Sequence, residues 1–303
     1  MVTTPAGAAL LANHPAVRRV VPYDKRGADA GVGGLLRIAA SVGPEEAGSV
    51  AYLAQGSVRS AVLALRAGYR ERVGFDTSAG RWLYSRRVTY RPEQHHAERL
   101  LRLARGDAAV ILPDELTPSL HPQAAERAGV DELLASHGVR GERLIALAPG
   151  SVWATKRWPG FPALAGSLAT HGRIVVIGGA EDRELAAAIA ATTPDAIDAT
   201  GRLSLLGSAE LIRRGALLVT NDSLPQHLAS AMGTPTVTIF GPTVPGFGFG
   251  PLAPRSISVG HETLPCRPCH PHGPAVCPLG HHLCMRDLGE PAVLARALRA
   301  LAA

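Results

Sequence analysis

The chain has 303 residues, of which 46% are hydrophobic, with 33 glycines and 24 prolines. This length is typical of two domains that each bury a core of their own. The sequence shows no apolar run near the roughly 18 residues that a membrane-spanning helix needs. Its short apolar patch near the start follows no basic residues, which argues against a secretory signal. These features predict a globular cytoplasmic protein.

The formal net charge is +6, and lysine contributes little to it, because Lys25 and Lys156 are the only two lysines. Positive charge concentrates in residues 81–105, which hold seven arginines and two glutamates. Such a stretch is either a solvated face or a surface that binds anions such as phosphates, acidic sugars or lipid headgroups.

The first 138 residues show strand-like and helix-like stretches. Residues 16–24 and 49–57 are typical of strands, and residues 60–68 and 97–106 are typical of helices. We therefore expect a first α/β domain over residues 1–138, with a linker near residues 138–142.

The second half alternates more clearly between apolar strands and helices. The predicted strands are residues 144–149, 173–179, 216–222 and 236–241. Strands this apolar, separated by helices, indicate a parallel sheet that is covered on both faces. Residues 139–303 are thus predicted to form a Rossmann-like domain, in which ligands bind at the carboxyl ends of the strands.

Residues 221–243, NDSLPQHLASAMGTPTVTIFGPT, place polar residues between two of these strands. Ser223 is a typical N-cap, Pro225 fits the first turn of a helix, and Gly233 is a typical helix end. The start of this helix suits an anion such as phosphate, with Asp222 before it and His227 in its first turn. The alternative is that these polar residues only cap the helix and face solvent.

Other predicted strand ends also carry polar residues. Ser151, Thr155 and Lys156 follow the strand at 144–149, and Lys156 is a candidate phosphate ligand. Glu181 follows the strand at 173–179, where an acid either binds a ligand or stabilises a helix start.

All four cysteines fall in residues 264–288, together with four histidines. They are Cys266, Cys269, Cys277 and Cys284. The first pair has the CxxC spacing of a metal knuckle, whereas six residues separate the second pair. A structural zinc site, packed thiols and an iron–sulfur cluster stay open as alternatives, and disulfides are disfavoured in a cytoplasmic protein.

The stretch 221–243 resembles the signature of glycosyltransferase family 9, the ADP-heptose:lipopolysaccharide heptosyltransferases. The residues in register are Asn221, Asp222, Ser223, Pro225, His227, Leu228, Ala229, Gly233, Pro235, Phe240, Gly241, Pro242 and Thr243. Residues 148–159, APGSVWATKRWP, are similar to another family motif, and residues 264–288 are similar to the tail of the heptosyltransferase II branch. Leu224 departs from the pattern, because the family has glycine there, which can adopt positive φ and let a diphosphate approach.

The resemblance implies a GT-B architecture, with two Rossmann-like domains facing across a cleft. The first domain would bind the acceptor, a lipid A–Kdo or heptosylated inner core, and the second would bind ADP-heptose. The implied reaction transfers heptose from ADP-L-glycero-D-manno-heptose to the inner core of lipopolysaccharide with inversion, and it requires no cofactor or metal. The protein would work at the inner face of the cytoplasmic membrane, and no nucleic acid is an expected partner.

The resemblance also assigns donor-binding roles. Ser151 or Thr155 would join Lys156 at the diphosphate, Glu181 would approach the ribose, and Leu203 would lie against the adenine. The complete predicted donor set is Ser151, Thr155, Lys156, Glu181, Leu203, Asp222, Ser223, Leu224 and His227.

Family members begin with a strand and a tight turn that carries the acid cast as the general base. Residues 2–24 resemble the second unit of the family, so we expect the true start to lie upstream of Met1. Asp222 and Lys156 are then the candidate catalytic residues. The alternatives are a degenerate, non-catalytic nucleotide-sugar-binding module and a family 9 transferase that uses another donor.

Overall fold

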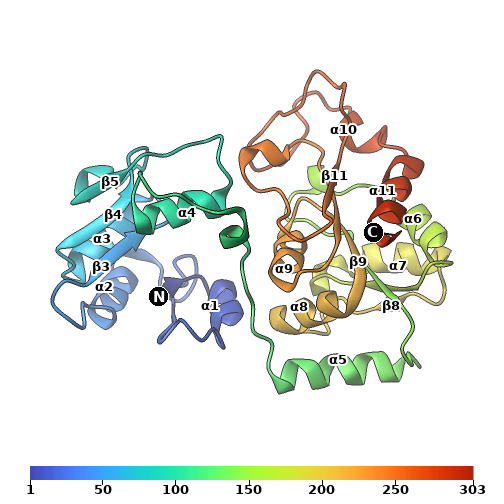
Figure 1. Ribbon diagram of the computed structural model, residues 1–303, viewed down its shortest axis with the longest axis horizontal. Coiled ribbons are helices and arrows are strands. Elements are labelled where there is room, and N and C mark those ends of the chain that lie inside the picture. The colour runs from blue at the N-terminus through green and yellow to red at the C-terminus, as the bar shows by residue number, and fades with distance from the viewer. Residues whose placement is uncertain (303) are drawn as a thin grey trace. The chain divides into compact units, whose positions relative to one another are not determined.

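The computed structural model describes residues 1–302, which form two compact units, Met1–Leu116 and a second one that begins at Thr117 (Figure 1). The predicted boundary at residue 138 differs from this division, because helix α5 (Ala124–Ser136) belongs to the second unit. Helix α5 lies against α8 (Leu205–Arg214), and Arg214 Nη1 of α8 is 2.5 Å from Asp131 Oδ1 of α5.

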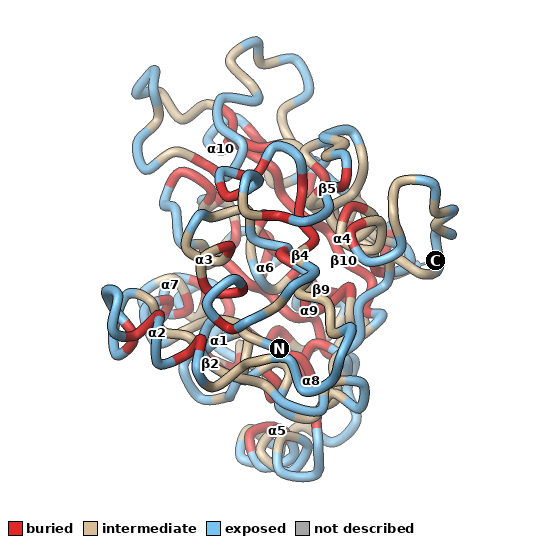
Figure 2. Tube along the Cα trace, turned by 90° about the vertical axis from the view of Figure 1, so that its left-hand side faces the viewer, coloured by how far each residue is buried: buried red, intermediate tan, exposed pale blue. Residues whose placement is uncertain are grey.

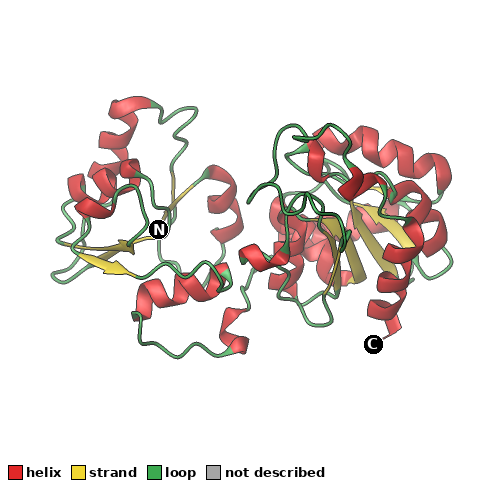
Figure 3. Ribbon diagram, turned by 90° about the horizontal axis from the view of Figure 1, so that it is seen from above, coloured by secondary structure: helices red, strands yellow, loops and turns green. Residues whose placement is uncertain are grey.

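The second unit is built on one six-stranded parallel sheet with the strand order β11-β10-β9-β6-β7-β8. Figure 3 shows this sheet in yellow, surrounded by helices in red. Its strands are β6 (Leu144–Ala148), β7 (Arg173–Val176), β8 (Ile197–Asp198), β9 (Gly215–Asn221), β10 (Thr236–Ile239) and β11 (Ile257–Val259). The four predicted strands correspond to β6, β7, β9 and β10, and the short strands β8 and β11 extend the sheet at its edges. Every residue of β6 and β10 is buried, as a sheet covered on both faces requires. Buried residues are drawn in red in Figure 2.

Helices cover both faces of this sheet. The helices α6 (Phe161–Leu168), α7 (Arg183–Thr192) and α11 (Glu290–Ala302) share one core with the sheet, and α8 packs against α9 (Leu224–Met232). Alternate residues of the strands supply that core, including Ile145 and Leu147 of β6. The parallel strands and covering helices predicted for this half of the chain are therefore confirmed.

The strand order brings two loops together. The chain runs outward from β6 through β7 to β8 and then returns to β9, which pairs with the opposite side of β6. The loops that leave the carboxyl ends of β6 and β9 are therefore neighbours. Such a reversal is the place where open α/β sheets bind ligands.

The first unit contains two smaller parallel sheets, β1-β2 and β3-β4-β5. Its strands are β1 (Val2–Thr3), β2 (Val21–Pro22), β3 (Val50–Leu53), β4 (Glu71–Phe75) and β5 (Arg86–Val88). Its helices are α1 (Pro5–Leu11), α2 (Gly31–Ser41), α3 (Val58–Arg66) and α4 (His96–Arg105), and the short 3₁₀ turns η1 (Arg81–Leu83) and η2 (Pro113–Leu116) complete it. The predicted helices at 60–68 and 97–106 correspond to α3 and α4, whereas only Val21–Pro22 of the predicted strand at 16–24 is paired.

The arginine-rich stretch 81–105 is partly structural. Arg99 is buried, with its guanidinium carbon 4.7 Å from the centre of the Tyr90 ring. Arg102 pairs with Glu98 at 3.1 Å and also donates to two loop carbonyls. The arginines of this stretch that are exposed are Arg81, Arg86, Arg87 and Arg105, so any anion-binding surface is smaller than the sequence indicates.

Over residues 1–302, no helix has both the length and the apolar character to cross a membrane.

Glu210 of α8 forms ion pairs whose contribution to the stability of the second unit can be tested. Its carboxylate is 1% exposed and is bonded by Arg213 at 2.7 Å and by Arg214 at 2.8 Å. The hydrogen bond from Arg213, opposed by burial and supported by Arg214, lowers the pKa of Glu210 from 4.5 to about 2.

We expect Glu210→Gln to lower the free energy of unfolding by about 1–3 kcal/mol at pH 7, since Arg213 is half exposed and solvent screens part of the pair. A depressed carboxyl pKa stabilises the fold above the unfolded-state pKa, so the difference should shrink as the pH falls from 4.5 toward about 2. Urea unfolding at several pH values measures this, with Glu184→Gln on exposed α7 surface as the control. A difference that does not change with pH would contradict the assignment.

Candidate functional site

Asn221, the last residue of β9, connects the two loops at the reversal of strand order. Its side chain is completely buried. Asn221 Nδ2 donates to the Pro149 carbonyl at 2.7 Å, and Asn221 Oδ1 accepts from the Trp158 amide at 3.1 Å. One amide side chain thereby fixes both ends of the loop after β6 against the carboxyl end of β9.

Asp222 gathers side chains from three segments. Its Oδ2 lies 2.7 Å from Lys156 Nζ and accepts a hydrogen bond from Thr243 Oγ1, also at 2.7 Å. Its Oδ1 accepts from Gln226 Nε2 at 2.8 Å. Lys156 comes from the loop after β6, Gln226 from α9, and Thr243 from the loop after β10.

The ion pair between Lys156 and Asp222 is nearly enclosed, because the two side chains are only 11% and 12% exposed. Burying two charges is costly unless the remaining hydrogen-bonding positions are also used. Thr243 and Gln226 meet this need on the carboxylate, whereas an ammonium has three donors and Asp222 uses one. Lys156 therefore keeps donors that can bind a further anion.

The start of α9 lies directly beside this pair. Ser223 occupies the N-cap position, as predicted, but its side chain makes no capping hydrogen bond. Its hydroxyl lies 3.4 Å from both Thr220 Oγ1 and the Asn221 carbonyl. The first amides of α9 are thus uncapped by this side chain and suit an anion. Gly233 ends the helix with a φ of 72°, as predicted.

Leu224 is the first residue of α9 and does not have a positive φ. The conformational freedom of glycine is therefore not required at this position, and the departure from the family pattern does not strain the backbone. The Leu224 side chain is 43% exposed, so it adds bulk at the rim of the site.

The loop after β6 uses its polar residues differently from the prediction. Lys156 reaches Asp222, but Thr155 Oγ1 donates to the Pro274 carbonyl at 2.5 Å. The Thr155 hydroxyl is therefore turned toward the cysteine-rich segment. Ser151 is half-buried, and its carbonyl accepts from a guanidinium in the same loop.

The loop after β7 contains an acid that the sequence analysis did not select. The predicted Glu181 is exposed in the turn η4 (Ala180–Asp182), whereas Asp182 is buried. Asp182 Oδ2 accepts from the Gly179 amide at 3.1 Å, and burial raises the pKa of Asp182. A Cβ added at Gly150 would lie 2.3 Å from this carboxylate, so glycine is needed there. The Gly178-Gly179 pair shortly before Asp182 was the sequence signal that could have pointed to this acid.

Leu203 and His227 lie near the starts of two helices, α8 and α9. Leu203 is half-buried and directly precedes Ser204, which caps α8 through a hydrogen bond to the Gly207 amide. His227 is half-buried in the first turn of α9.

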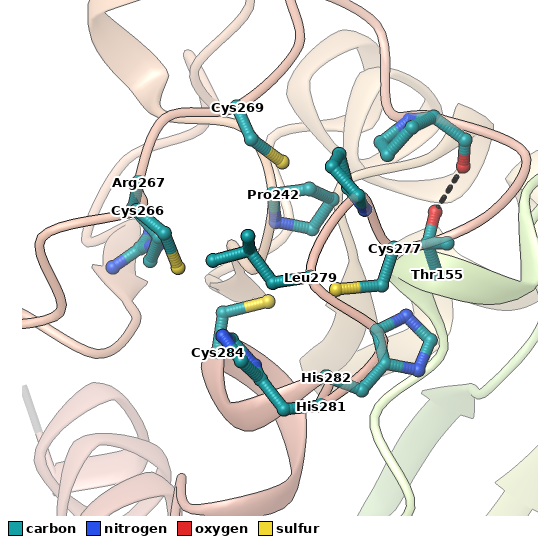
Figure 4. Close-up of a pocket in the computed structure, with 12 residues that line it drawn as sticks. Thr155, Pro242, Cys266, Arg267, Cys269, Cys277, Leu279, His281, His282 and Cys284 are labelled. Atoms are coloured by element: carbon teal, nitrogen blue, oxygen red, sulfur yellow. Dashed lines mark hydrogen bonds between the residues drawn. The ribbon is translucent and has the colours of Figure 1, made fainter.

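The four cysteines line one small cavity of about 30 Å³, which Thr155 and Pro242 also line (Figure 4). All four are free thiols. Backbone amides of the loop before Cys284, first that of His282, lower the pKa of Cys277, whereas burial raises the pKa of Cys284 to about 11. Among the described residues, no group of three or more Cys, His, Asp or Glu side chains is arranged to hold a metal ion. The four thiols therefore converge on one cavity, and none of them forms a disulfide.

Comparison with known proteins assigns the chain to a family. The profile of "Glycosyltransferase family 9 (heptosyltransferase)" matches residues 38–276. The chain belongs to glycosyltransferase family 9. Lipopolysaccharide heptosyltransferase 1 of Pseudomonas aeruginosa is 31% identical over 225 residues, 71% of this chain and 60% of that protein. Lipopolysaccharide heptosyltransferase 2 of Salmonella typhimurium is 34% identical over 151 residues, 46% of this chain and 42% of that protein. This family 9 chain thus spans 60% or less of the length of both relatives.

Solved structures of the family share the fold. The ADP-heptose lipopolysaccharide heptosyltransferase II of E. coli matches with a TM-score of 0.74 at 22% identity, covering 99% of this chain and 88% of that chain. The family 9 glycosyl transferase of Veillonella parvula matches with a TM-score of 0.74 at 23% identity, covering 85% and 75%. The predicted α/β fold of the GT-B class is confirmed for this family 9 chain.

In this family 9 chain, Asn221 and Ser223 should differ sharply in their effect on stability. Asn221→Ala leaves the Pro149 carbonyl and the Trp158 amide without their partner, so we expect a loss of about 2–4 kcal/mol in the free energy of unfolding. Ser223→Ala removes no capping bond and should cost no more than about 0.5 kcal/mol. Urea unfolding measures both. A loss near the typical cap value of about 1 kcal/mol for Ser223→Ala would show that its hydroxyl does cap α9.

Proposed function

We propose that this protein transfers heptose from ADP-L-glycero-D-manno-heptose to the inner core of lipopolysaccharide. The observation that carries the proposal is the enclosed Lys156–Asp222 pair, which lies at the reversal of strand order beside the uncapped start of α9. A cation and helix amides at that position suit a sugar diphosphate. Membership of family 9 supports the choice of donor and reaction.

The donor would lie along the carboxyl ends of the second-unit strands. We place its diphosphate at Lys156 and the first amides of α9. The ribose hydroxyls would face the loop after β7, where the exposed Glu181 can reach them, and the adenine would lie near Leu203. Ser151, Ser223 and His227 would complete the polar surroundings of the sugar and diphosphate, and Leu224 would border the sugar.

The proposed transfer is a direct displacement that inverts the anomeric centre. The acceptor oxygen forms a bond to the anomeric carbon and loses its proton, while the bond from that carbon to the diphosphate breaks and its electron pair leaves with ADP. Lys156 and the α9 amides stabilise the negative charge that develops on the leaving diphosphate. This stabilisation comes from residues of the chain, so we propose transfer without a metal or another cofactor.

Asp222 is proposed as a positioning residue for Lys156. Both of its oxygens already accept hydrogen bonds, from Lys156, Thr243 and Gln226. A carboxylate held in this way is poorly placed to take a proton from the acceptor hydroxyl. We therefore assign neither Asp222 nor Lys156 as the general base.

The acceptor is proposed to be a lipid A–Kdo or heptosylated inner core, bound by the first unit at the inner face of the cytoplasmic membrane. The exposed arginines Arg81, Arg86 and Arg87 support this, since they offer positive charge to an anionic glycolipid.

A structural zinc at the four cysteines stays a prediction. The convergence of the thiols on one cavity supports it, although their arrangement does not form a metal site. Metal analysis of the purified protein decides between zinc, iron and packed thiols.

The release of ADP tests the function directly. We expect the full-length protein to release ADP from ADP-heptose when a Kdo-lipid A or heptosylated core acceptor is present, and to release little without an acceptor. Binding of ADP without any release would favour a non-catalytic binding module. Release only from another ADP-sugar would identify a family member with a different donor.

The role of Lys156 predicts a selective effect on donor binding. Lys156→Ala should raise the Kd for ADP by about 10-fold to 100-fold, because a charge-assisted hydrogen bond to phosphate contributes about 1.5–3 kcal/mol. Calorimetry measures the Kd for ADP. Thermal unfolding measures the loss of folding stability, which we expect to be smaller than the loss of binding free energy for ADP. Lys25→Ala, which removes the other lysine, is the matched control. An unchanged affinity for ADP in Lys156→Ala would remove this residue from the site.

A further inference from the structure

The cysteine-rich segment, residues 264–288, holds the loop that follows β10. It does so through the backbone carbonyls of Phe240, Gly241, Pro242 and Thr243. The Arg267 guanidinium donates to three of these carbonyls, including that of Phe240 at 2.8 Å. The Cys269 amide donates to the fourth, that of Pro242, at 3.1 Å. Thr243, which bonds Asp222, is thereby fixed from outside its own loop.

The same segment also holds the loop that carries Lys156. Gly273 is buried with a φ of 91°, and a Cβ built on it would lie 2.6 Å from Lys156 Cδ and 3.0 Å from Lys156 Cγ. The next residue, Pro274, accepts the hydroxyl of Thr155 through its carbonyl. The backbone of Gly273 and Pro274 therefore forms a wall against the aliphatic part of Lys156.

We propose that the cysteine-rich segment is a positioning element of the donor site, and that Gly273 holds Lys156 in the conformation that places its ammonium on Asp222 and the diphosphate. This inference rests on the proposed function for its ligand. The inference adds Gly273 and its segment to the residues that shape the donor site. This segment lies outside the donor loops and takes no part in the transfer chemistry.

The physical reason is the flexibility of lysine. A lysine side chain has several rotatable bonds, and fixing them costs rotamer entropy. Backbone packed against Cγ and Cδ excludes the conformations in which the side chain bends away from Asp222. Because apparent affinity falls with the fraction of protein in the competent conformation, this packing should strengthen donor binding.

Gly273→Ala, with Gly280→Ala as the matched control, tests the proposal. Both glycines lie in the segment and have positive φ, 91° and 70°, so alanine strains the backbone similarly at either position. No atom lies within 4 Å of a Cβ built on Gly280. The two variants therefore share the strain and differ in the contact with Lys156 and in a looser one, at 3.3 Å, with Trp153 Cδ1.

The first readout does not need ADP. Lys156 and Lys25 are the only lysines, so amine acylation followed by peptide mass spectrometry compares the enclosed lysine with an internal reference. We expect the rate for Lys156 relative to Lys25 to rise by about fivefold or more in Gly273→Ala and to stay within about twofold in Gly280→Ala. Equal changes in both variants, or none in Gly273→Ala, would overturn the proposal.

The second readout is the Kd for ADP. Gly273→Ala should weaken ADP binding by about 5-fold to 30-fold in the wild-type background and have no further effect in Lys156→Ala, because it acts through that residue. A loss that persists without Lys156 would contradict the inference. If the wild-type protein binds no ADP, the proposed function fails, and the acylation rates still decide whether the segment positions Lys156.

Thr155 supplies a second variant should Gly273→Ala not fold. Thr155→Val removes the hydrogen bond to the Pro274 carbonyl, and Thr155→Ser retains it. We expect faster acylation of Lys156 in Thr155→Val and a rate near that of the wild type in Thr155→Ser. The same rate in both variants would exclude this contact from the positioning of Lys156.

Discussion

Asp222 accepts hydrogen bonds from Lys156, Gln226 and Thr243, which come from three different parts of the second unit. Together these donors make a nearly enclosed charge tolerable. The carboxylate therefore acts as a fixed point to which the loop after β6, the helix α9 and the loop after β10 are all tied. The arrangement of the proposed donor site depends on this one side chain more than on any other.

The sheet determines why Asp222 can have this role. Parallel strands end at the same edge, and the reversal of strand order places the loops after β6 and β9 next to each other. Asn221 then bonds directly across that gap, one residue before Asp222. Asn221 and Asp222 therefore have different roles. The buried amide of Asn221 bonds backbone groups of the neighbouring loop, and the carboxylate of Asp222 bonds polar side chains.

Much of this could be predicted from the sequence, because its signals are local. The apolar strands, the start of α9 and its end at Gly233 follow from patterns within a few residues. The partners of Asp222 and the burial of Asp182 depend on contacts between distant loops, which periodicity does not record. Thr155 shows the same limit: its position in the loop was recognisable, but its hydroxyl bonds Pro274, more than a hundred residues away in the chain. The backbone at Leu224 is a related case, since its helical conformation, which does not need glycine, is read from the structure and not from the family pattern.

In the proposed donor site, the Lys156–Asp222 pair would also limit the affinity for the donor. A diphosphate that approaches Lys156 meets an ammonium that already has a carboxylate partner, so the ligand shares this cation with Asp222 and gains less than it would from a solitary lysine. In return, the lysine is held in place before the donor arrives, which reduces the ordering that binding requires. Strong binding of ADP would also slow the release of ADP after transfer. A site that stabilises the leaving diphosphate must afterwards release it. A lysine that is held in place, and whose positive charge Asp222 partly compensates, suits both requirements.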